Sequence, residues 1–165
     1  MNAGAYGSET KDIIESARVM TIEGEEKVLS LPELELGYRT SCIPANRYIV
    51  LEARYRLKPG SKTEIRAYMD ELAARRKSKQ PLEYPSAGST FKRPEGYFAG
   101  TLIDQTGLKG LTVGGAQVSE KHAGFVINTG SATCADVQEL IRRVQEAVYR
   151  AHGVRLEPEV RFVGE

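Results

Sequence analysis

The sequence predicts an α+β fold, and three stretches carry most of that prediction. Residues 48–57 alternate apolar and polar side chains with a period of two, as expected for a strand with one buried face. Residues 62–77 and 134–152 instead repeat apolar side chains at the spacing of amphipathic helices. A length of 165 residues suits one full domain or two small ones, with enough chain for a buried core.

The first half of the chain is predicted to contain mostly short elements. Residues 9–16 suggest one or two helical turns. Residues 17–22 and 27–31 predict a hairpin around a turn that contains Gly24. A second short helix is expected at residues 32–36, before the strand at 48–57.

The helix at residues 62–77 is expected to bury one apolar stripe. The stripe consists of Ile65, Tyr68, Met69 and Leu72. The basic residues at 75–79 indicate a solvated helix end, because cations favour the C-terminus of a helix. Pro81 and Pro85 follow, and because proline interrupts regular structure, we place the domain boundary there.

The second half is predicted to contain a short helix, a strand, a long helix and a final strand. These elements span residues 97–105, 124–128, 134–152 and 156–163. Thr133 and Asp136 fit a capping box at the start of the long helix, and Gly153 fits its end. Pro158 indicates an edge position or a bulge in the final strand, because proline has no N–H to donate.

Charge, cysteine content and hydropathy argue against several classes of function. The 23 Lys and Arg against 22 Asp and Glu leave a net charge of +1, which gives no broad basic field for nucleic acid. Cys42 and Cys134 are too few for a disulfide framework, and neither His122 nor His152 has a neighbour at metal-ligand spacing. No apolar run approaches the roughly 20 residues of a membrane span, and a signal peptide is not evident. We therefore expect a cytoplasmic protein with no metal, membrane or nucleic-acid partner.

Two polar segments are candidates for binding chemistry. Residues 86–94 combine small residues and hydroxyls with Lys92 and Arg93, which could hold a diphosphate. Residues 114–124 contain paired glycines but match neither a dinucleotide fingerprint nor a P-loop. The polar side chains of this second segment include Gln117, Glu120, Lys121 and His122. The residue types alone favour structured surface turns for both segments.

Arg39 and Glu159 form a third constellation, although they lie far apart in the sequence. An arginine can stabilise negative charge that develops on a substrate, and a protonated glutamic acid can donate a hydrogen bond. Only the fold could bring these two residues together. Taken singly, each is explained by a surface ion pair.

Five segments in order along the chain resemble the UDP-N-acetylenolpyruvoylglucosamine reductases, the MurB flavoenzymes of bacterial peptidoglycan synthesis. They are residues 2–7, 37–41, 88–94, 114–124 and 156–162. The variant that the chain resembles is the shorter, type II form. The resemblance implies an oxidoreductase that uses NADPH and FAD to reduce UDP-N-acetylglucosamine enolpyruvate to UDP-N-acetylmuramate. Cell-wall biogenesis, cell shape and cell division depend on that reaction.

The resemblance also implies roles for individual residues. Ser89 matches the general acid that protonates the reduced substrate, and Arg39 and Glu159 match residues that stabilise its negative charge. The segment that approaches FAD contains Asn2, Ala3, Gly4, Tyr6 and Gly7. The matched substrate-binding residues are Tyr38, Lys92, Arg93, Gln117, Lys121 and His122.

The resemblance covers the C-terminal half of the family pattern. Residues 1–80 then correspond to a remnant of the FAD-binding lobe, and residues 81–165 to a small α+β substrate-binding domain. Because loops that hold the FAD pyrophosphate precede this half, we expect the chain alone to bind FAD weakly or not at all and to be inactive. Apolar surface left bare could drive self-association. Two alternatives are a non-redox UDP-sugar-binding module and one half of a split reductase.

Overall fold

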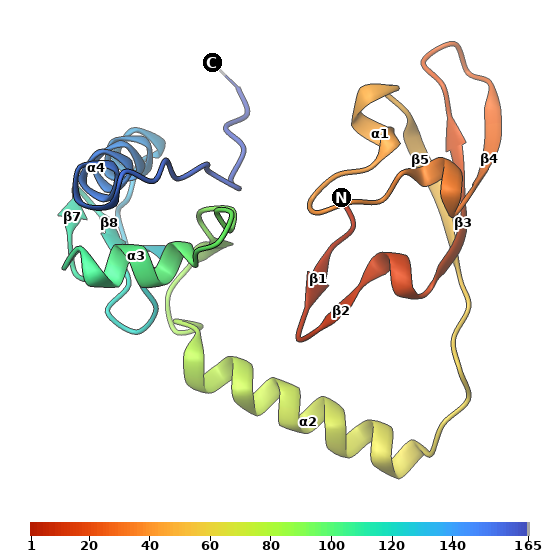
Figure 1. Ribbon diagram of the computed structural model, residues 1–165, viewed down its shortest axis with the longest axis horizontal. Helices are drawn as coiled ribbons and strands as arrows, with labels where there is room; N and C mark the ends of the chain where they lie inside the picture. The colour runs from red at the N-terminus through yellow and green to blue at the C-terminus, as the bar shows by residue number, and fades with distance from the viewer. Residues whose placement is uncertain (165) are drawn as a thin grey trace. The chain divides into compact units, whose positions relative to one another are not determined.

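Three antiparallel sheets and several helices make up the computed structural model, which describes residues 1–164 and confirms the predicted α+β class (Figure 1). The chain divides into two compact units, Met1–Lys62 and Thr63–Glu165. Glu165, the last residue of the second predicted domain, lies outside the described residues. The division falls at the start of helix α2 (Lys62–Lys79), whereas the predicted boundary at residues 80 and 81 follows that helix.

A three-stranded antiparallel sheet in the order β4-β3-β5 forms the first unit (Figure 1). Its strands are β3 (Ile14–Met20), β4 (Glu26–Ser30) and β5 (Ile49–Tyr55), which confirms the predicted hairpin and the predicted strand at 48–57. The buried core of this unit is small and centres on Ala17, Val19 and Leu34.

The short elements of the first unit differ in part from the prediction. Only Thr10–Asp12 forms a 3-10 turn, η1, and the helix expected over residues 9–16 is otherwise wrong. Strand β3 begins at Ile14, which pairs with Tyr55 of β5, so sheet pairing outweighs the local helical pattern. The helix expected near residues 32–36 is the 3-10 turn η2 (Pro32–Leu34), and a short helix α1 (Cys42–Ala45) was not predicted.

The apolar faces of β5 and α2 are not buried as their periodicity indicated. All seven residues of β5 are exposed, and so are Ile65, Tyr68 and Met69 on α2. The periodicity correctly identified a strand and a helix because it reports local geometry. Burial needs a second surface, and no described residue covers these faces.

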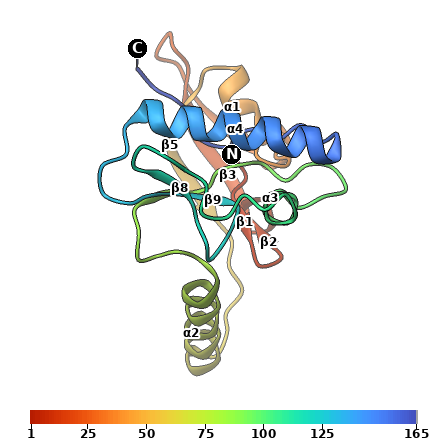
Figure 2. The same cartoon turned by 90° about the vertical axis from the view of Figure 1, so that its left-hand side faces the viewer.

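The second unit contains a four-stranded antiparallel sheet in the order β6-β9-β8-β7. The strands are β6 (Ser86–Ser89), β7 (Thr112–Val113), β8 (Ala116–Val118) and β9 (Phe125–Asn128). Helices α3 (Ala99–Gln105) and α4 (Cys134–His152) pack with this sheet (Figure 2). The predicted elements at 97–105, 124–128 and 134–152 are therefore confirmed.

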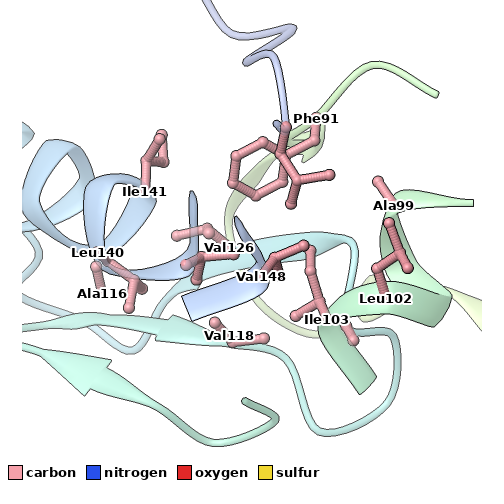
Figure 3. Packing of buried hydrophobic residues seen from close by; sticks show 13 residues of the cluster. Phe91, Ala99, Leu102, Ile103, Ala116, Val118, Val126, Leu140, Ile141 and Val148 are labelled. Carbon is pink, nitrogen blue, oxygen red and sulfur yellow. The ribbon is translucent and has the colours of Figure 1, made fainter. Parts of the chain in front are cut away.

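The main hydrophobic core lies between α4, α3 and the sheet of the second unit (Figure 3). Helix α4 contributes one buried stripe, which consists of Leu140, Ile141, Val144 and Val148. Ile103 of α3 and Val118 of β8 meet this stripe. Thr133 and Asp136 form the predicted capping box, and Gly153 ends the helix with a φ of 70°.

The final strand expected at residues 156–163 is absent among the described residues. Pro158 makes only an isolated bridge with Phe91. The N–H of Glu159 donates to the carbonyl of Thr90 at 2.8 Å, and Glu157 accepts from the N–H of Lys92 at 2.8 Å. Pro158 itself has no N–H, so the pairing stops after this short contact instead of extending into a ladder.

No helix within residues 1–164 has the length and the apolar composition that crossing a bilayer would require.

Candidate functional site

Thr90 brings two of the predicted catalytic residues, Ser89 and Glu159, to the same place in the second unit. Thr90 is 2% exposed, and its N–H donates to the carbonyl of Gly124 at 2.8 Å. Its hydroxyl oxygen accepts from the N–H of Val126 at 3.0 Å, and its carbonyl accepts from Glu159. Residues separated by about 70 positions are thus joined through one buried backbone unit.

The hydroxyl of Ser89 is accessible for chemistry. Ser89 is exposed, and its hydroxyl donates only a long hydrogen bond of 3.5 Å, to the carbonyl of Phe91. The register between β6 and β9 shifts before Ser89, where Gly88 has a φ of 85°. A side chain at position 88 would strain this left-handed conformation, so glycine permits the turn that presents Ser89.

Ser89 lines a cavity of about 380 Å³ together with residues from two other segments. The polar and aromatic residues around it are Ser89, Phe98, Thr101, Asp104, Lys109, Lys121 and His122. The structure therefore brings together Ser89, Lys121 and His122, which were predicted from separate motifs. The cavity carries two lysines against one aspartate, a charge balance that suits an anionic ligand.

Sequence reasoning missed Phe98, Asp104 and Lys109. Lys109 pairs with Asp104 at 3.0 Å, and the side chain of Lys109 is one-third exposed. The only signal in the sequence was a single lysine between two glycine-containing turns. Its place in the cavity depends on how α3 packs and could not be deduced from spacing.

A buried serine holds the turn that carries Lys121 and His122. Ser119 is 1% exposed, and its hydroxyl oxygen accepts from the N–H of Lys121 at 3.2 Å and of His122 at 3.3 Å. The ammonium of Lys121 donates to the carbonyl of Lys77 at 3.0 Å and lies 3.5 Å from Glu83. Lys121 thus holds the end of α2, which explains why that helix groups with the second unit.

The surroundings of His122 favour the neutral form of its imidazole ring. Burial lowers the pKa of the imidazole below its ordinary value of 6.5, and the positive charge of Lys109 lowers it further. The ring also packs edge-on against Phe125, with the ring centres 4.9 Å apart.

The depressed pKa of His122 predicts how stability depends on pH. The unfolded ring takes up a proton at a higher pH than the folded ring, so the free energy of unfolding should fall as pH drops below 6.5. The loss should level off once the folded ring is also protonated, and it should vanish above pH 6.5. Urea unfolding across this range measures the step, which His122→Asn should reduce. Equal pH profiles for the wild type and His122→Asn would contradict the assignment.

The remaining predicted substrate-binding residues of the second unit take different positions. The guanidinium of Arg93 lies 4.0 Å from the ring centre of Phe98, so it stands next to the cavity wall. Lys92 pairs with Glu157 and does not line the cavity. Gln117 lies on β8, donates to the hydroxyl of Thr112 at 3.1 Å, and is also absent from the lining. The ligand roles of Lys92 and Gln117 stay predictions.

In the first unit, Asn2 joins the two segments predicted to approach the cofactor and the substrate. Asn2 is 4% exposed; its amide donates to Glu9 at 2.7 Å and to the carbonyl of Gly37 at 3.1 Å. Its oxygen accepts from the N–H of Lys11 at 2.9 Å. Both amide N–H groups and the oxygen of this side chain therefore have partners in the fold, and the predicted contact of Asn2 with FAD stays a prediction.

Arg39 stands on a tight turn whose ends, Gly37 and Thr40, exchange backbone hydrogen bonds of 3.3 Å. Its φ of 55° is unusual for a residue with a side chain, and its guanidinium lies 5.1 Å from the ring centre of Tyr38. Arg39 and Tyr38 belong to the first unit, whereas Ser89 and Glu159 belong to the second.

The residues predicted to approach FAD fit that role in one respect. Strands β1 (Gly4–Ala5) and β2 (Ser8–Glu9) form a hairpin whose turn residues, Tyr6 and Gly7, have φ of 53° and 82°. No atom lies within 4 Å of the place where a Cβ on Gly7 would stand, so a flat ring can approach the backbone there.

The helices of the first unit offer no N-terminal site for the FAD diphosphate. The helices within residues 1–62 have three or four residues each, too short for an N-terminal phosphate site, apart from the first residue of α2. The turn at Tyr6 and Gly7 therefore fits contact with a ring, and the expected weak binding of FAD stays a prediction.

The family model for the UDP-N-acetylenolpyruvoylglucosamine reductase C-terminal domain matches residues 80–163, the segment that contains the cavity. The chain belongs to this reductase family. A UDP-N-acetylenolpyruvoylglucosamine reductase of Agathobacter rectalis is 61% identical over the whole chain, and one of Exiguobacterium sibiricum is 56% identical. The chain covers 52% and 54% of these relatives.

A solved reductase has the same fold as the chain. The crystal structure of UDP-N-acetylenolpyruvylglucosamine reductase (MurB) from Thermus caldophilus matches with a TM-score of 0.83 at 42% identity. The match covers 96% of this chain and 56% of that one. The chain thus spans about half the length of the reductases it matches, and the family-model match includes Ser89, Lys121, His122 and Glu159.

Proposed function

We propose that the chain provides the substrate-binding part of a UDP-N-acetylmuramate dehydrogenase, which reduces UDP-N-acetylglucosamine enolpyruvate with NADPH and FAD. One observation carries the proposal: Ser89, Lys121 and His122 meet in one cavity, and Thr90 joins that cavity to Glu159. The names of the related reductases specify the same substrate. A nucleotide-linked substrate of this kind also favours the cytoplasm as the place of reaction.

If FAD were bound against the turn at Tyr6 and Gly7 and reduced by NADPH, it would supply the hydride in this proposal. Ser89 then donates its hydroxyl proton to the substrate carbon that becomes basic. A serine hydroxyl is a weak acid, so this transfer needs a strongly basic acceptor within hydrogen-bond reach. The exposed hydroxyl of Ser89, with only one long hydrogen bond of its own, supports this role.

Arg39 and Glu159 have complementary roles toward negative charge on the enolpyruvyl group. The fixed positive charge of Arg39 stabilises that charge more in the transition state than in the ground state. Glu159 would have to be protonated, or hydrogen-bonded through its neighbours, to help an anion, because a bare carboxylate would repel it. Its backbone hydrogen bond to Thr90 holds it near Ser89.

The diphosphate of the substrate is expected to meet the cations of the cavity. Lys109 and Lys121 line the cavity directly, and Arg93 stands at its edge against Phe98. Lysine provides a point charge and arginine a planar fork, and both groups recur at phosphate sites.

Calorimetric titration of the full chain with UDP-N-acetylglucosamine enolpyruvate tests the proposal. One ligand should bind per chain, and Lys121→Met should weaken binding about tenfold or more, as loss of a charged hydrogen bond does. Lys58→Met, an exposed lysine of the first unit, is the matched control and should leave the affinity unchanged. The absence of binding heat, or equal losses in the two variants, would count against the assignment.

A further inference from the structure

We propose that His122 is a fixed hydrogen-bond donor that presents its Nε2–H to an oxygen atom of the ligand in the cavity lined by Ser89. The inference rests on the proposed function and gives Nε2 of His122 a specific role in ligand binding. The ligand oxygen is anionic or carbonyl in character, as the phosphates and carboxylate of a UDP-sugar derivative provide.

The first argument is the hydrogen bond at the other ring nitrogen. The N–H of Gly124 donates to Nδ1 of His122 at 3.1 Å. A backbone N–H is always a donor, so Nδ1 must offer a lone pair. A neutral imidazole with an accepting Nδ1 carries its proton on Nε2. The backbone of the same turn therefore selects the tautomer.

The second argument is how closely the ring is held. A Cβ added to Gly100 would lie 3.3 Å from Cε1 of His122, and a Cβ added to Gly124 would lie 3.0 Å from it. Phe125 supports the ring edge-on from within the sheet. Two glycines thus leave just enough room for the imidazole. A ring confined in this way loses little further freedom when a ligand binds.

The third argument concerns the space that Nε2 faces. Within residues 1–164, no other residue accepts a hydrogen bond from Nε2 of His122. Every buried side-chain nitrogen or oxygen in this range does have a hydrogen-bond partner, so an Nε2 without one is not buried. Nε2 is therefore open to solvent. Because the ring lines the cavity with Ser89, Lys109 and Lys121, that cavity is where a ligand can reach it.

The neighbouring charges suit this arrangement. Lys109 pairs with Asp104 and Lys121 pairs with Glu83, so both lysines attract an anion while each retains an acidic partner. Lysine side chains are flexible and give little direction to the bond they donate. A neutral imidazole with one N–H in a set direction can orient the ligand oxygen that the lysines attract.

Two substitutions separate the donor role from a structural one. His122→Asn places an amide oxygen near the position of Nδ1, where it can still accept from Gly124, but removes the donor at Nε2. His122→Gln extends an amide N–H toward the position of Nε2. Calorimetry with UDP-N-acetylglucosamine as the probe should show about tenfold weaker binding for His122→Asn, and His122→Gln should retain most of the affinity.

Nitrogen-15 NMR of histidine-labelled chain provides the second measurement. The free chain should show the His122 proton on Nε2, and the probe should shift that signal. A proton on Nδ1, or wild-type affinity in His122→Asn, would overturn the inference while leaving the proposed function intact. A wild-type chain that binds neither the probe nor the enolpyruvate would instead contradict the proposed function itself.

Discussion

Replacing Gly115 with alanine is expected to destabilise the second unit by about 3 kcal/mol or more, the upper range for forcing atoms into a filled site. A Cβ at this position would lie 2.3 Å from the backbone nitrogen of Ala132 and 2.5 Å from the carbonyl carbon of Ser131. Both are main-chain atoms, so no side-chain rotation can relieve the contact. The loop before α4 or the turn between β7 and β8 would have to move.

The same movement would break further contacts. The carbonyl of Gly115 accepts from the N–H of Thr129 at 2.9 Å and from its hydroxyl at 2.9 Å. These bonds hold the end of β9 against the turn. Strand β8 begins directly after Gly115 and leads into the turn that carries Lys121 and His122. We therefore expect the substitution to weaken ligand binding as well.

Urea unfolding of the full chain measures this effect, with amide hydrogen exchange in β8 and β9 to assign it to the second unit. Gly96→Ala is the matched control. Gly96 has a φ of 73° and no atom within 4 Å of the place where a methyl group would stand, so alanine there should cost only the left-handed strain, about 1 kcal/mol. Equal losses at the two glycines would show that crowding at Gly115 is not the cause.

Leu140→Ala is expected to destabilise the second unit by about 2 to 5 kcal/mol, the range for deleting a large side chain from a packed core. Leu140 is fully buried on α4, where it belongs to the main hydrophobic core and lies beside Ala116 of the sheet (Figure 3). Alanine leaves a cavity that the sheet and the helix can close only in part. Helix propensity does not offset the loss, because leucine and alanine both favour helices.

Hydrogen exchange in α4 and urea unfolding measure the effect of Leu140→Ala. Leu82→Ala is the control within the same unit, since Leu82 is 52% exposed and its truncation should change stability by less than about 0.5 kcal/mol. A small loss for Leu140→Ala, close to that of Leu82→Ala, would contradict the placement of the core under α4.

The predictions from sequence succeeded where a pattern reports local geometry. Helix α4 begins and ends at the predicted residues because Thr133, Asp136 and Gly153 satisfy its terminal backbone groups from nearby in the chain. The hairpin of β3 and β4 follows for a similar reason, since its turn contains Gly24 with a φ of 89°. These interactions span a few residues, so spacing alone reveals them.

The predictions failed where distant segments compete. Strand β3 begins at Ile14 because β5 pairs with it, although the local pattern favoured a helical turn. The segment around Pro158 pairs only briefly with Phe91, because the proline offers no donor. The apolar residues of β5 and α2 showed the correct periodicity and are nevertheless exposed. Periodicity identifies an element but not the surface it meets.

For the candidate site too, the sequence identified individual residues, and only the fold showed that they lie together. Motifs in the sequence identified Ser89, Lys121 and His122 individually, and their resemblance to a reductase family indicated that all three act on the same substrate. Their meeting in one cavity depends on β6, β9 and α3 packing together. The place of Lys109 in that cavity could not be deduced from the sequence, because it depends on how α3 packs.

The amino-acid sequence by itself determined the α+β class, the long capped helix and the family of this protein, because short-range spacing and ordered motifs carry that information. Only the tertiary structure decided that Thr90 links Ser89 to Glu159 and that Gly124 sets the tautomer of His122. Both depend on hydrogen bonds whose direction is set by the path of the backbone. Residue types alone do not specify that path.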